Sequence, residues 1–372
     1  MRRLLIALVC LAIAGAILAD SLSRSGRQVP AGPVVAALPA RPGWLGLNAN
    51  TSGYLGPLDT FSRAGVVFDR NLDLQAGSLP GAGDSRRLAE DHALGMSPVA
   101  VIEYRGYGRP GSEFQADPEF PRERSAAEAA QGRATIAAYV AGFLRTAGAI
   151  SQLAGARDPG TEVRFEVMNE PWGNTTPQYD AAQYAAVVAA LLPAATAAGI
   201  PAQDIYVAAT GEACVSSGCR ANAWVEEMYR AQPALRQEVQ GWYLHPYGPA
   251  SGLSAYANGG IDAVALIRAG ISAGRGNLIV SEVGFCAREV NNPAGAQAGV
   301  DCHGSPAISG AQAAASLETV LERARAYHRQ GWLRALIVYS RNDGGWAMQL
   351  PGGALTPSGR ALLRFAAADG SG

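Results

Sequence analysis

Short apolar segments alternate with longer segments rich in Ala and Arg along most of the chain. The short segments are rich in β-branched residues, which favour strands, and apolar residues recur at helical spacing in the longer ones. Eight such alternations fit a closed parallel barrel better than an open doubly wound sheet, so we expect a single (β/α)8 TIM-barrel domain. The predicted strands cover residues 44–47, 65–69, 99–103, 163–168, 205–209, 241–244, 278–281 and 335–339.

The predicted helices lie between these strands and after the last one. No Gly-x-Gly-x-x-Gly loop follows the first strand, which disfavours a dinucleotide-binding sheet. Two long connections, 104–123 and 286–308, follow the C-terminal ends of strands three and seven, the end of a barrel where active sites are assembled. The helices cover residues 57–64, 84–95, 124–154, 180–199, 220–231, 260–272, 309–330 and 356–368.

The N-terminal segment has a different composition from the rest of the chain. Met1-Arg2-Arg3 precedes an uninterrupted apolar run over 4–19, which is the order found in secretory signals. The run is short for a membrane span but ends at a mediocre cleavage site, so 1–19 is a signal peptide or an N-terminal anchor. Residues 20–42 predict a flexible linker and 43–369 the barrel. We expect a secreted or cell-envelope protein.

Charge and composition exclude several classes of function. The formal net charge is −1 and no basic run occurs, so nucleic acid is not an expected partner. A membrane is expected as a partner only through an uncleaved N-terminal anchor. All 30 positive side chains are arginine. The absence of lysine excludes Schiff-base aldolases, pyridoxal-phosphate enzymes and Walker A nucleotide sites, because arginine keeps its proton.

Four cysteines follow the N-terminal segment, in two pairs that are close in sequence. In an oxidising compartment we expect two disulfides, Cys214 with Cys219 and Cys286 with Cys302. A zinc site is the alternative, but only His303 stands near either pair, which makes a poor ligand set. We therefore expect no metal.

Two acidic residues stand where predicted strands end. Strand four ends in polar Asn169 and Glu170 followed by Pro171, and strand seven leads into Glu282. The C-terminal ends of barrel strands meet at one rim, so both carboxyl groups can face one cleft. Glycoside hydrolysis with retention needs two carboxyl groups about 5–5.5 Å apart, one to donate a proton and one to act as nucleophile.

The segments Asn169-Glu170-Pro171 and 281–285 resemble the motifs of a large clan of retaining β-glycosidases, in particular its cellulase-like and xylosidase-like families 5 and 39. The resemblance extends over nearly the whole chain after the linker. It implies that Glu170 is the acid/base, that Glu282 is the nucleophile, and that Asn169 hydrogen-bonds the 2-hydroxyl of the sugar. No cofactor is implied.

Further positions match the same clan. His245-Pro246-Tyr247 resembles its His-x-Tyr, in which the tyrosine contacts the nucleophile and the histidine lies near the acid/base or the sugar. Arg70 matches the arginine that keeps the nucleophile ionised, and Trp346 the aromatic platform after strand eight. Two departures leave the sugar open: Glu103 ends strand three where many relatives place a histidine, and Trp346 comes later than usual.

Other residues at strand ends are candidates for contacts with substrate, namely Asn48, Glu103 and Trp172. A structural role is the alternative for each of the candidates. Arg70 could pair with a neighbouring aspartate, His245 could be a core histidine, and Trp172 and Trp346 could pack at the rim.

The sequence thus predicts an enzyme that cleaves a β-linked oligo- or polysaccharide outside the cytoplasm by double displacement. Two alternatives remain open, a carbohydrate-binding barrel without turnover and a transglycosylase that uses the same residues. A metal-dependent barrel of the enolase type is disfavoured, because its base is a lysine or histidine and the chain has no lysine and 4 histidines.

Overall fold

The computed structural model describes residues 43–48, 58–104, 126–156, 161–171, 180–209, 222–248, 260–271, 277–288, 307–341, 344–350 and 352–369. All of them belong to one compact unit, residues 37–372. The predicted N-terminal segment and linker, 1–42, lie outside the described residues.

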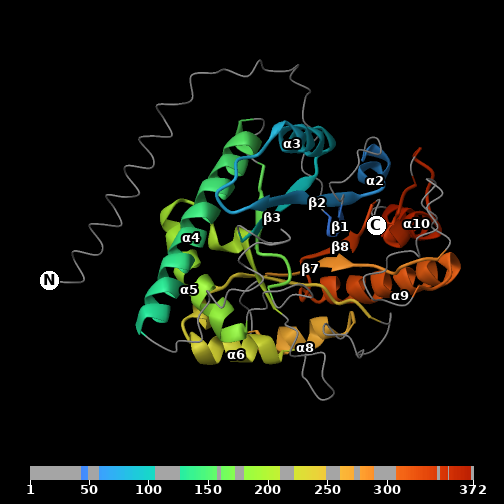
Figure 1. The fold of residues 1–372 in the computed structure, drawn as a ribbon. Helices are drawn as coiled ribbons and strands as arrows, with labels where there is room; N and C mark the ends of the chain where they lie inside the picture. Colours follow the sequence, from blue (N-terminus) through green and yellow to red (C-terminus); the bar gives the residue numbers. More distant parts are fainter. Residues whose placement is uncertain are drawn as a thin grey trace. The chain divides into compact units, whose positions relative to one another are not determined.

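Eight parallel strands close into a barrel in sequence order, with β8 hydrogen-bonded to β1 (Figure 1). This arrangement confirms the predicted (β/α)8 fold. The strands are β1 Leu45–Asn48, β2 Val66–Gln75, β3 Ser97–Glu103, β4 Arg164–Val167, β5 Ile205–Ala208, β6 Gly241–Leu244, β7 Asn277–Val283 and β8 Ala335–Tyr339.

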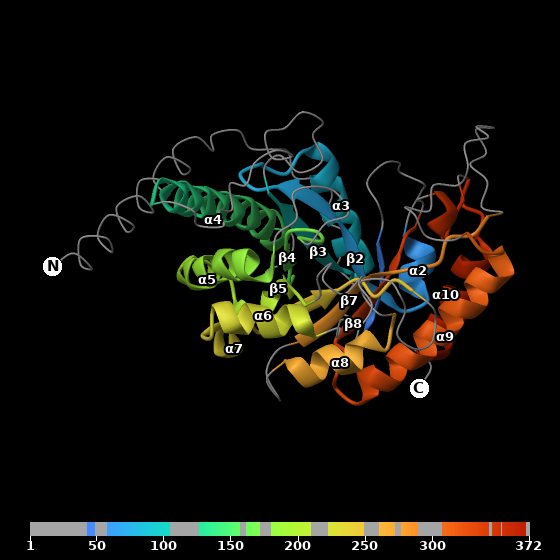
Figure 2. The ribbon, with the colours of Figure 1, turned by 60° about the horizontal axis from the view of Figure 1, so that its bottom comes forward.

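The helices lie around these strands (Figure 2). Two of them begin with a capping box, which explains their sharp start: Asp180 and Ser309 accept the backbone N–H of Gln183 and Gln312, whose side chains reach back. The short α7 is not among the predicted helices. The helices are α2 Asp59–Arg63, α3 Ala82–Leu94, α4 Ala126–Gly155, α5 Ala181–Ala197, α6 Ala223–Ala231, α7 Leu235–Glu238, α8 Ala263–Gly270, α9 Gly310–Arg329 and α10 Pro357–Asp369, with 3-10 turns at η2 Ala202–Asp204 and η4 Gly344–Trp346.

Strand β2 departs most from the prediction, because it continues to Gln75 instead of ending at residue 69. It contains a bulge: Arg70 pairs with Val99 and Leu72 with Ala100, which leaves Asn71 as an extra residue. The polar residues around the bulge interrupt the apolar pattern from which strand ends are predicted. Arg70 therefore lies inside the strand and does not close it.

A buried pair of carboxyl groups lies on the outer side of the same strand. Asp69 of β2 and Asp91 of α3 are hydrogen-bonded to each other and almost fully buried. The amide Nδ2 of Asn71 donates to Asp69 Oδ2 at 2.5 Å and lies 3.4 Å from Asp91 Oδ2. Burial raises the pKa of Asp69 to about 6 and that of Asp91 well above its usual range. The pair therefore shares a proton near neutral pH.

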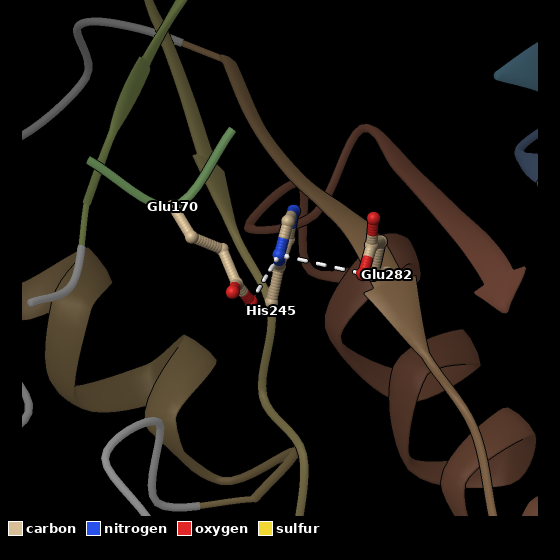
Figure 3. Close-up of side chains that lie close together, drawn as sticks. All are labelled: Glu170, His245 and Glu282. Atoms are coloured by element: carbon tan, nitrogen blue, oxygen red, sulfur yellow. Dashed lines mark hydrogen bonds and ion pairs between the residues drawn. The ribbon is translucent and has the colours of Figure 1, made fainter. Parts of the chain in front are cut away.

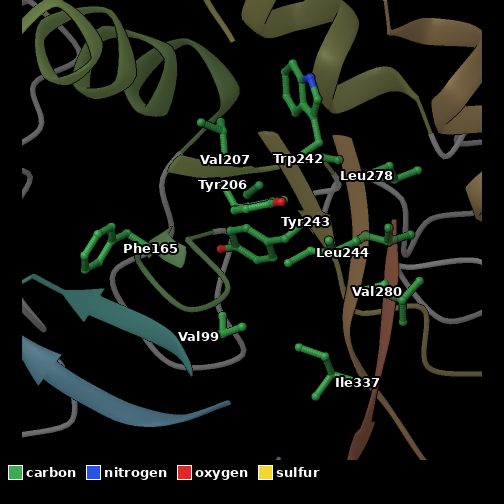
Figure 4. Close-up of a cluster of buried hydrophobic side chains, with 14 of the residues drawn as sticks. Val99, Phe165, Tyr206, Val207, Trp242, Tyr243, Leu244, Leu278, Val280 and Ile337 are labelled. Atoms are coloured by element: carbon green, nitrogen blue, oxygen red, sulfur yellow. The ribbon is translucent and has the colours of Figure 1, made fainter. Parts of the chain in front are cut away.

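Strand β6 shows why the barrel strands form here. Trp242, Tyr243 and Leu244 are consecutive and all fully buried, as expected for a parallel strand covered on both faces. Figure 4 shows them in the apolar cluster that also includes Phe165 and Ile337. Such uninterrupted apolar runs made the strands predictable.

Three buried tyrosines fix the ends of β3 and β4. The hydroxyl of Tyr243 donates to the carbonyl of Met168 at 2.7 Å, and that of Tyr184 to the carbonyl of Val167 at 2.7 Å. Tyr139 of α4 donates to the carbonyl of Ile102 at 2.8 Å. These bonds satisfy carbonyl groups at the strand ends and hold the backbone from which the candidate catalytic residues extend.

Helix α4 is the longest helix of the described part of the chain, and its stretch Gly132–Gly155 is long and apolar enough to span a membrane. The helix packs on β2, β3 and α5 and buries Tyr139, Phe143 and Ile150 against them. Core helices of large barrels have the same composition, so we assign α4 to the barrel wall.

Candidate active site

The backbone at the end of β4 has an unusual conformation. Met168 and Glu170 have φ angles of 63° and 44°, in the left-handed region that favours glycine. Such residues cost about 1–3 kcal/mol each and are found where the surrounding structure imposes them, often at functional sites. Here the Tyr243 hydroxyl holds the Met168 carbonyl, and the Asn169 N–H donates to Glu103 Oε1 at 3.1 Å. The turn presents Asn169 and Glu170 at the rim.

Glu282, near the end of β7, is surrounded by hydrogen-bond donors. Arg70 Nη1 donates to its Oε1 at 2.5 Å, and the Tyr247 hydroxyl donates to its Oε2 at 2.8 Å. The side chain is almost buried, with a tenth of its surface exposed. Both oxygens of one carboxylate are thus held by donors from β2 and from the segment after β6.

Asn48, at the end of β1, contacts Arg70. With its amide oriented so that both ends are hydrogen-bonded, Asn48 donates to the Arg70 carbonyl at 3.1 Å and accepts from Arg70 Nη1 at 2.9 Å. In the opposite orientation the Asn48 amide nitrogen lies 3.5 Å from Glu282 Oε1, which is at the limit of a hydrogen bond. We therefore assign Asn48 to holding Arg70.

His245 lies between the two candidate catalytic carboxyl groups (Figure 3). Its Nδ1 is 2.9 Å from Glu170 Oε1 and 3.6 Å from Glu282 Oε2, and its Nε2 is 3.1 Å from Ser281 Oγ. The imidazole is fully buried. The two alternatives for His245 therefore do not exclude each other. Its ring is buried like that of a core histidine, and it contacts both acids of the site.

The electrostatics of the cluster favour an ionised Glu282. Burial opposes the charge, but His245, Arg70 and Tyr247 outweigh it and lower the pKa of Glu282. Burial likewise opposes a charge on His245, and the Glu282 carboxylate and the hydrogen bond to Glu170 raise the pKa of His245 above its usual value. A negative Glu282 and a positive His245 stabilise each other.

The two candidate catalytic carboxyl groups face each other at short range. One oxygen of Glu170 lies within 4.8 Å of one oxygen of Glu282. Inverting glycosidases need about 6.5–9.5 Å between the carboxyl groups to admit a water, and retaining ones about 5–5.5 Å. The short distance between the nearest oxygens is closer to the spacing of retaining enzymes than to that of inverting ones.

Glu166, in the middle of β4, is a residue of the site that the sequence analysis missed. It is fully buried, and its Oε2 accepts from Arg70 Nε at 2.9 Å and lies 2.8 Å from Arg70 Nη2. One signal could have revealed it: an acidic side chain within an otherwise mostly apolar strand, four residues before Glu170 and on the strand that carries it.

Glu103, at the end of β3, is buried and contacts the backbone of Asn169, as described above. Burial raises the pKa of Glu103 well above its usual range. Its second oxygen, Oε2, has no hydrogen bond to a described residue. A neutral carboxyl group here can donate a hydrogen bond into the cleft, so the predicted contact with substrate stays a prediction.

The structure brings most of the predicted site residues together at the C-terminal rim of the barrel. Trp346, in η4, lies there too but is 4% exposed and packs edge-on against Tyr247, with ring centres 5.4 Å apart. Its role as a sugar platform stays a prediction. The residues gathered at the rim are Asn48, Arg70, Glu103, Asn169, Glu170, His245, Tyr247, Glu282 and Trp346.

Several predictions fall on residues outside the described part of the chain. They concern Trp172 as a sugar contact and the pairing of Cys214 with Cys219. Cys286 is disulfide-bonded and packs against Trp346, whereas Cys302, its predicted partner, lies outside the described residues. The pairing of these two cysteines stays a prediction.

Glu170, His245 and Glu282 could together offer three ligand atoms to a metal ion, all within 4.8 Å of one another. Their contacts do not favour that use. Both oxygens of Glu282 accept from Arg70 and Tyr247, and the Arg70 cation at 2.5 Å repels a second cation. These contacts fit two carboxyl groups held by hydrogen bonds better than a metal centre.

Fold and site thus define a (β/α)8 barrel with two facing carboxyl groups at its C-terminal rim. No family model matches the sequence, and no curated protein is detectably similar to it. A glucosidase from Croceicoccus marinus is similar in structure, with 13% identity and a TM-score of 0.52 over 90% of this chain and 69% of that one. This likeness confirms the fold.

Other similar structures are more distant by TM-score. The catalytic domain of a mannanase from Streptomyces sp. SirexAA-E has 16% identity and a TM-score of 0.48, over 91% of this chain and 93% of that chain. A family GH128 endo-β-1,3-glucanase from Amycolatopsis mediterranei has 14% identity and a TM-score of 0.47, over 86% and 98%.

Replacing Tyr247 by Phe tests the electrostatics of the cluster. Tyr247→Phe removes one donor from the Glu282 carboxylate, so the pKa of Glu282 rises and the acidic limb of the kcat/KM profile moves to higher pH. A hydrogen bond to a charged group contributes about 1.5–3 kcal/mol, so kcat/KM falls about tenfold or more. The measurement is the pH profile of the glycosidase reaction that is proposed below, on the glycoside that the protein cleaves fastest.

The matched control is Tyr327→Phe, because the Tyr327 hydroxyl donates to Asp262 at 2.9 Å outside the barrel. This variant should leave the acidic limb in place. If the acidic limb of the kcat/KM profile does not move in Tyr247→Phe, the Tyr247 hydroxyl does not stabilise the ionised Glu282.

Proposed function

We propose that this protein is a retaining glycoside hydrolase that cleaves β-glycosidic bonds by double displacement. The observation that carries the proposal is the pair Glu170 and Glu282, with oxygens within 4.8 Å and with Glu282 held ionised by Arg70, Tyr247 and His245. The fold supports it, and so does the resemblance of Asn169-Glu170-Pro171 to a glycosidase motif.

In the first step Glu282 attacks the anomeric carbon of the sugar. The C–O bond to the leaving group breaks, the leaving oxygen takes a proton from Glu170, and a glycosyl ester forms on Glu282. His245 Nδ1, at 2.9 Å from Glu170 Oε1, stabilises the carboxylate that remains on Glu170. Asn169, held by Arg70 Nη2 at 2.9 Å, is placed to bind the 2-hydroxyl.

In the second step a water attacks the same anomeric carbon. Glu170, now a carboxylate, takes the proton from this water, and the ester bond to Glu282 breaks with the electron pair returning to Glu282. The sugar leaves with the configuration it had in the substrate. Protons and charges in the site return to their starting state, with no cofactor.

We further propose that the enzyme acts outside the cytoplasm on an oligo- or polysaccharide. The support is the charged and apolar N-terminal segment, together with the names of the similar structures, a mannanase and a β-1,3-glucanase among them. These names set the order in which to test substrates: β-glucosides and β-1,3-glucans, then β-mannosides and mannans.

The decisive experiment is to trap the intermediate. The protein is first assayed on 4-nitrophenyl β-glycosides and on β-linked polysaccharides, and then treated with the 2-deoxy-2-fluoro glycosyl fluoride of the sugar that it cleaves. We expect one sugar added per chain, on the peptide that contains Glu282, and none in Glu282→Gln. Glu162 is mostly exposed and pairs with the buried Arg164, so Glu162→Gln is the control and should label like the wild type.

Other outcomes decide against the proposal. Activity without any trapped sugar, and a product of inverted configuration by NMR, would favour a single displacement. No turnover on the whole panel, with measurable binding of a glycan, would favour a carbohydrate-binding barrel.

A further inference from the structure

The deepest charged contact of the site is the pair formed by Arg70 and Glu166. Glu166 is fully buried, and its Oε2 receives both Nε and Nη2 of the guanidinium, at 2.9 and 2.8 Å. Its other oxygen, Oε1, has no hydrogen-bond partner among the described residues. A buried carboxylate needs a partner, and Arg70 is the partner of Glu166 among the described residues.

Arg70 in turn connects the strands that carry the chemistry. Nη1 donates to Glu282 of β7 and Nη2 to Asn169 at the end of β4. A planar guanidinium has a fixed fork of donors, so the two bonds to Glu166 set the plane of the group. That plane decides whether Nη1 meets the Glu282 carboxylate.

We propose that Glu166 is a positioning residue, which holds the Arg70 guanidinium so that Nη1 keeps Glu282 ionised and Nη2 keeps Asn169 in place. The role rests on the proposed function, since it matters for catalysis only if Glu282 is the nucleophile. Glu166 itself does not reach the reacting atoms: it lies beneath Arg70, in the middle of β4, with no exposed surface.

Positioning and simple charge repulsion predict opposite results. Glu166 is negative, so if it acted only through its field, its removal would favour the negative form of Glu282 and lower the pKa of that carboxyl group. If Glu166 positions Arg70, its removal frees the guanidinium to turn away, and the pKa of Glu282 rises. The direction of the change therefore distinguishes the two roles.

The experiment measures the protonation of Glu282 without substrate. The wild type, Glu166→Gln and Glu162→Gln are reacted at pH 5 with a water-soluble carbodiimide and glycine ethyl ester, which modify protonated carboxyl groups. Mass spectrometry follows the Glu282 peptide, with the exposed Glu238 as an internal reference. We expect Glu282 to react about tenfold faster in Glu166→Gln, which corresponds to one pKa unit.

Glu162→Gln is the matched control, because Glu162 lies on the same segment and pairs with Arg164 at 3.2 Å, mostly exposed. Its Glu282 should react as in the wild type. Glu166→Met, of similar volume but without an acceptor, is a second variant and should show a change at least as large; circular dichroism shows which variants are folded. An unchanged or slower reaction of Glu282 in the folded variants overturns the proposal.

Activity provides a separate readout. For the glycoside that the wild type cleaves best, we expect Glu166→Gln to lower kcat about tenfold to a hundredfold and to move the acidic limb of the profile to higher pH. If the wild type cleaves no glycoside, the proposed function fails, while the carbodiimide result still decides whether Glu166 positions Arg70.

Discussion

Replacing Glu282 by Gly is expected to lower kcat on an aryl β-glycoside by about 10⁴-fold, on the order of 5 kcal/mol of transition-state stabilisation. The variant lacks the carboxylate that Arg70 and Tyr247 hold and that attacks the anomeric carbon in the proposed mechanism, so no covalent intermediate is expected to form. It also leaves a space next to two donors, and azide should occupy it. We expect azide to restore turnover in Glu282→Gly and to yield the glycosyl azide of inverted configuration.

The companion variant Glu170→Ala separates the two roles. It should form the intermediate from a substrate with a good leaving group and then stall, because no base activates the water. Azide needs no base, so the expected product is the glycosyl azide of retained configuration. Equal azide products from the two variants, or a Glu282→Gly variant as active as the wild type, would contradict the assignment.

Replacing Asp91 by Asn is expected to stabilise the folded protein near pH 8. The wild type buries Asp69 and Asp91 side by side, and burial raises the pKa of Asp69 from 3.8 to about 6 and that of Asp91 further. A rise of that size corresponds to about 3 kcal/mol of stability lost once the group ionises. An Asn at 91 removes one acid and can donate its amide to Asp69, so a gain of about 2–3 kcal/mol is expected.

The pH dependence has a definite sign. The folded state binds these protons more tightly than the unfolded chain does, so stability is greatest at low pH and falls as the pH rises from about 4 through 6 and above. The Arg341 and Arg87 cations favour ionisation of Asp69 and limit this fall, whereas Glu90 adds to it. Asp91→Asn should flatten the curve.

Urea unfolding at several pH values, with and without the substitution, measures the effect. The control is Asp84→Asn, in the exposed first turn of the same helix, where Asp84 Oδ2 accepts the Gly81 N–H at 2.7 Å. That substitution should bring no gain at pH 8. A destabilised Asp91→Asn with an unchanged pH profile would show that the pair is ionised and satisfied in the native state.

The sequence predicted the fold because its strands are buried on both faces. Runs such as Trp242–Leu244 are apolar without interruption, and such runs placed most of the strands correctly. Strand β2 was misjudged because Asp69, Asn71 and Asp73 are polar and stand where an apolar pattern is expected. Asp69 belongs to the buried carboxyl pair with Asp91, and Asn71 is the extra residue of the bulge. Neither feature can be recognised from the local sequence.

The site was predicted in part. Asn169, Glu170 and Glu282 were located because each follows an apolar run that ends abruptly, and the resemblance assigned the roles of Arg70 and His245. Glu166 was missed, because a charged residue within a strand is satisfied by a partner distant in the chain, here at a sequence separation of 96. The contact exists only once β2 and β4 lie in the same barrel.

The position of His245 between two acids has a consequence for the timing of catalysis. The anion of Glu282 at 3.6 Å helps to keep the imidazole protonated. In the proposed double displacement Glu282 becomes an ester and loses its charge, so His245 loses that support, while Glu170 becomes negative on the other side of the ring. In that mechanism the negative charge next to the imidazole alternates between the two glutamates, and the same buried histidine, without moving, stabilises the carboxylate in each of the two steps.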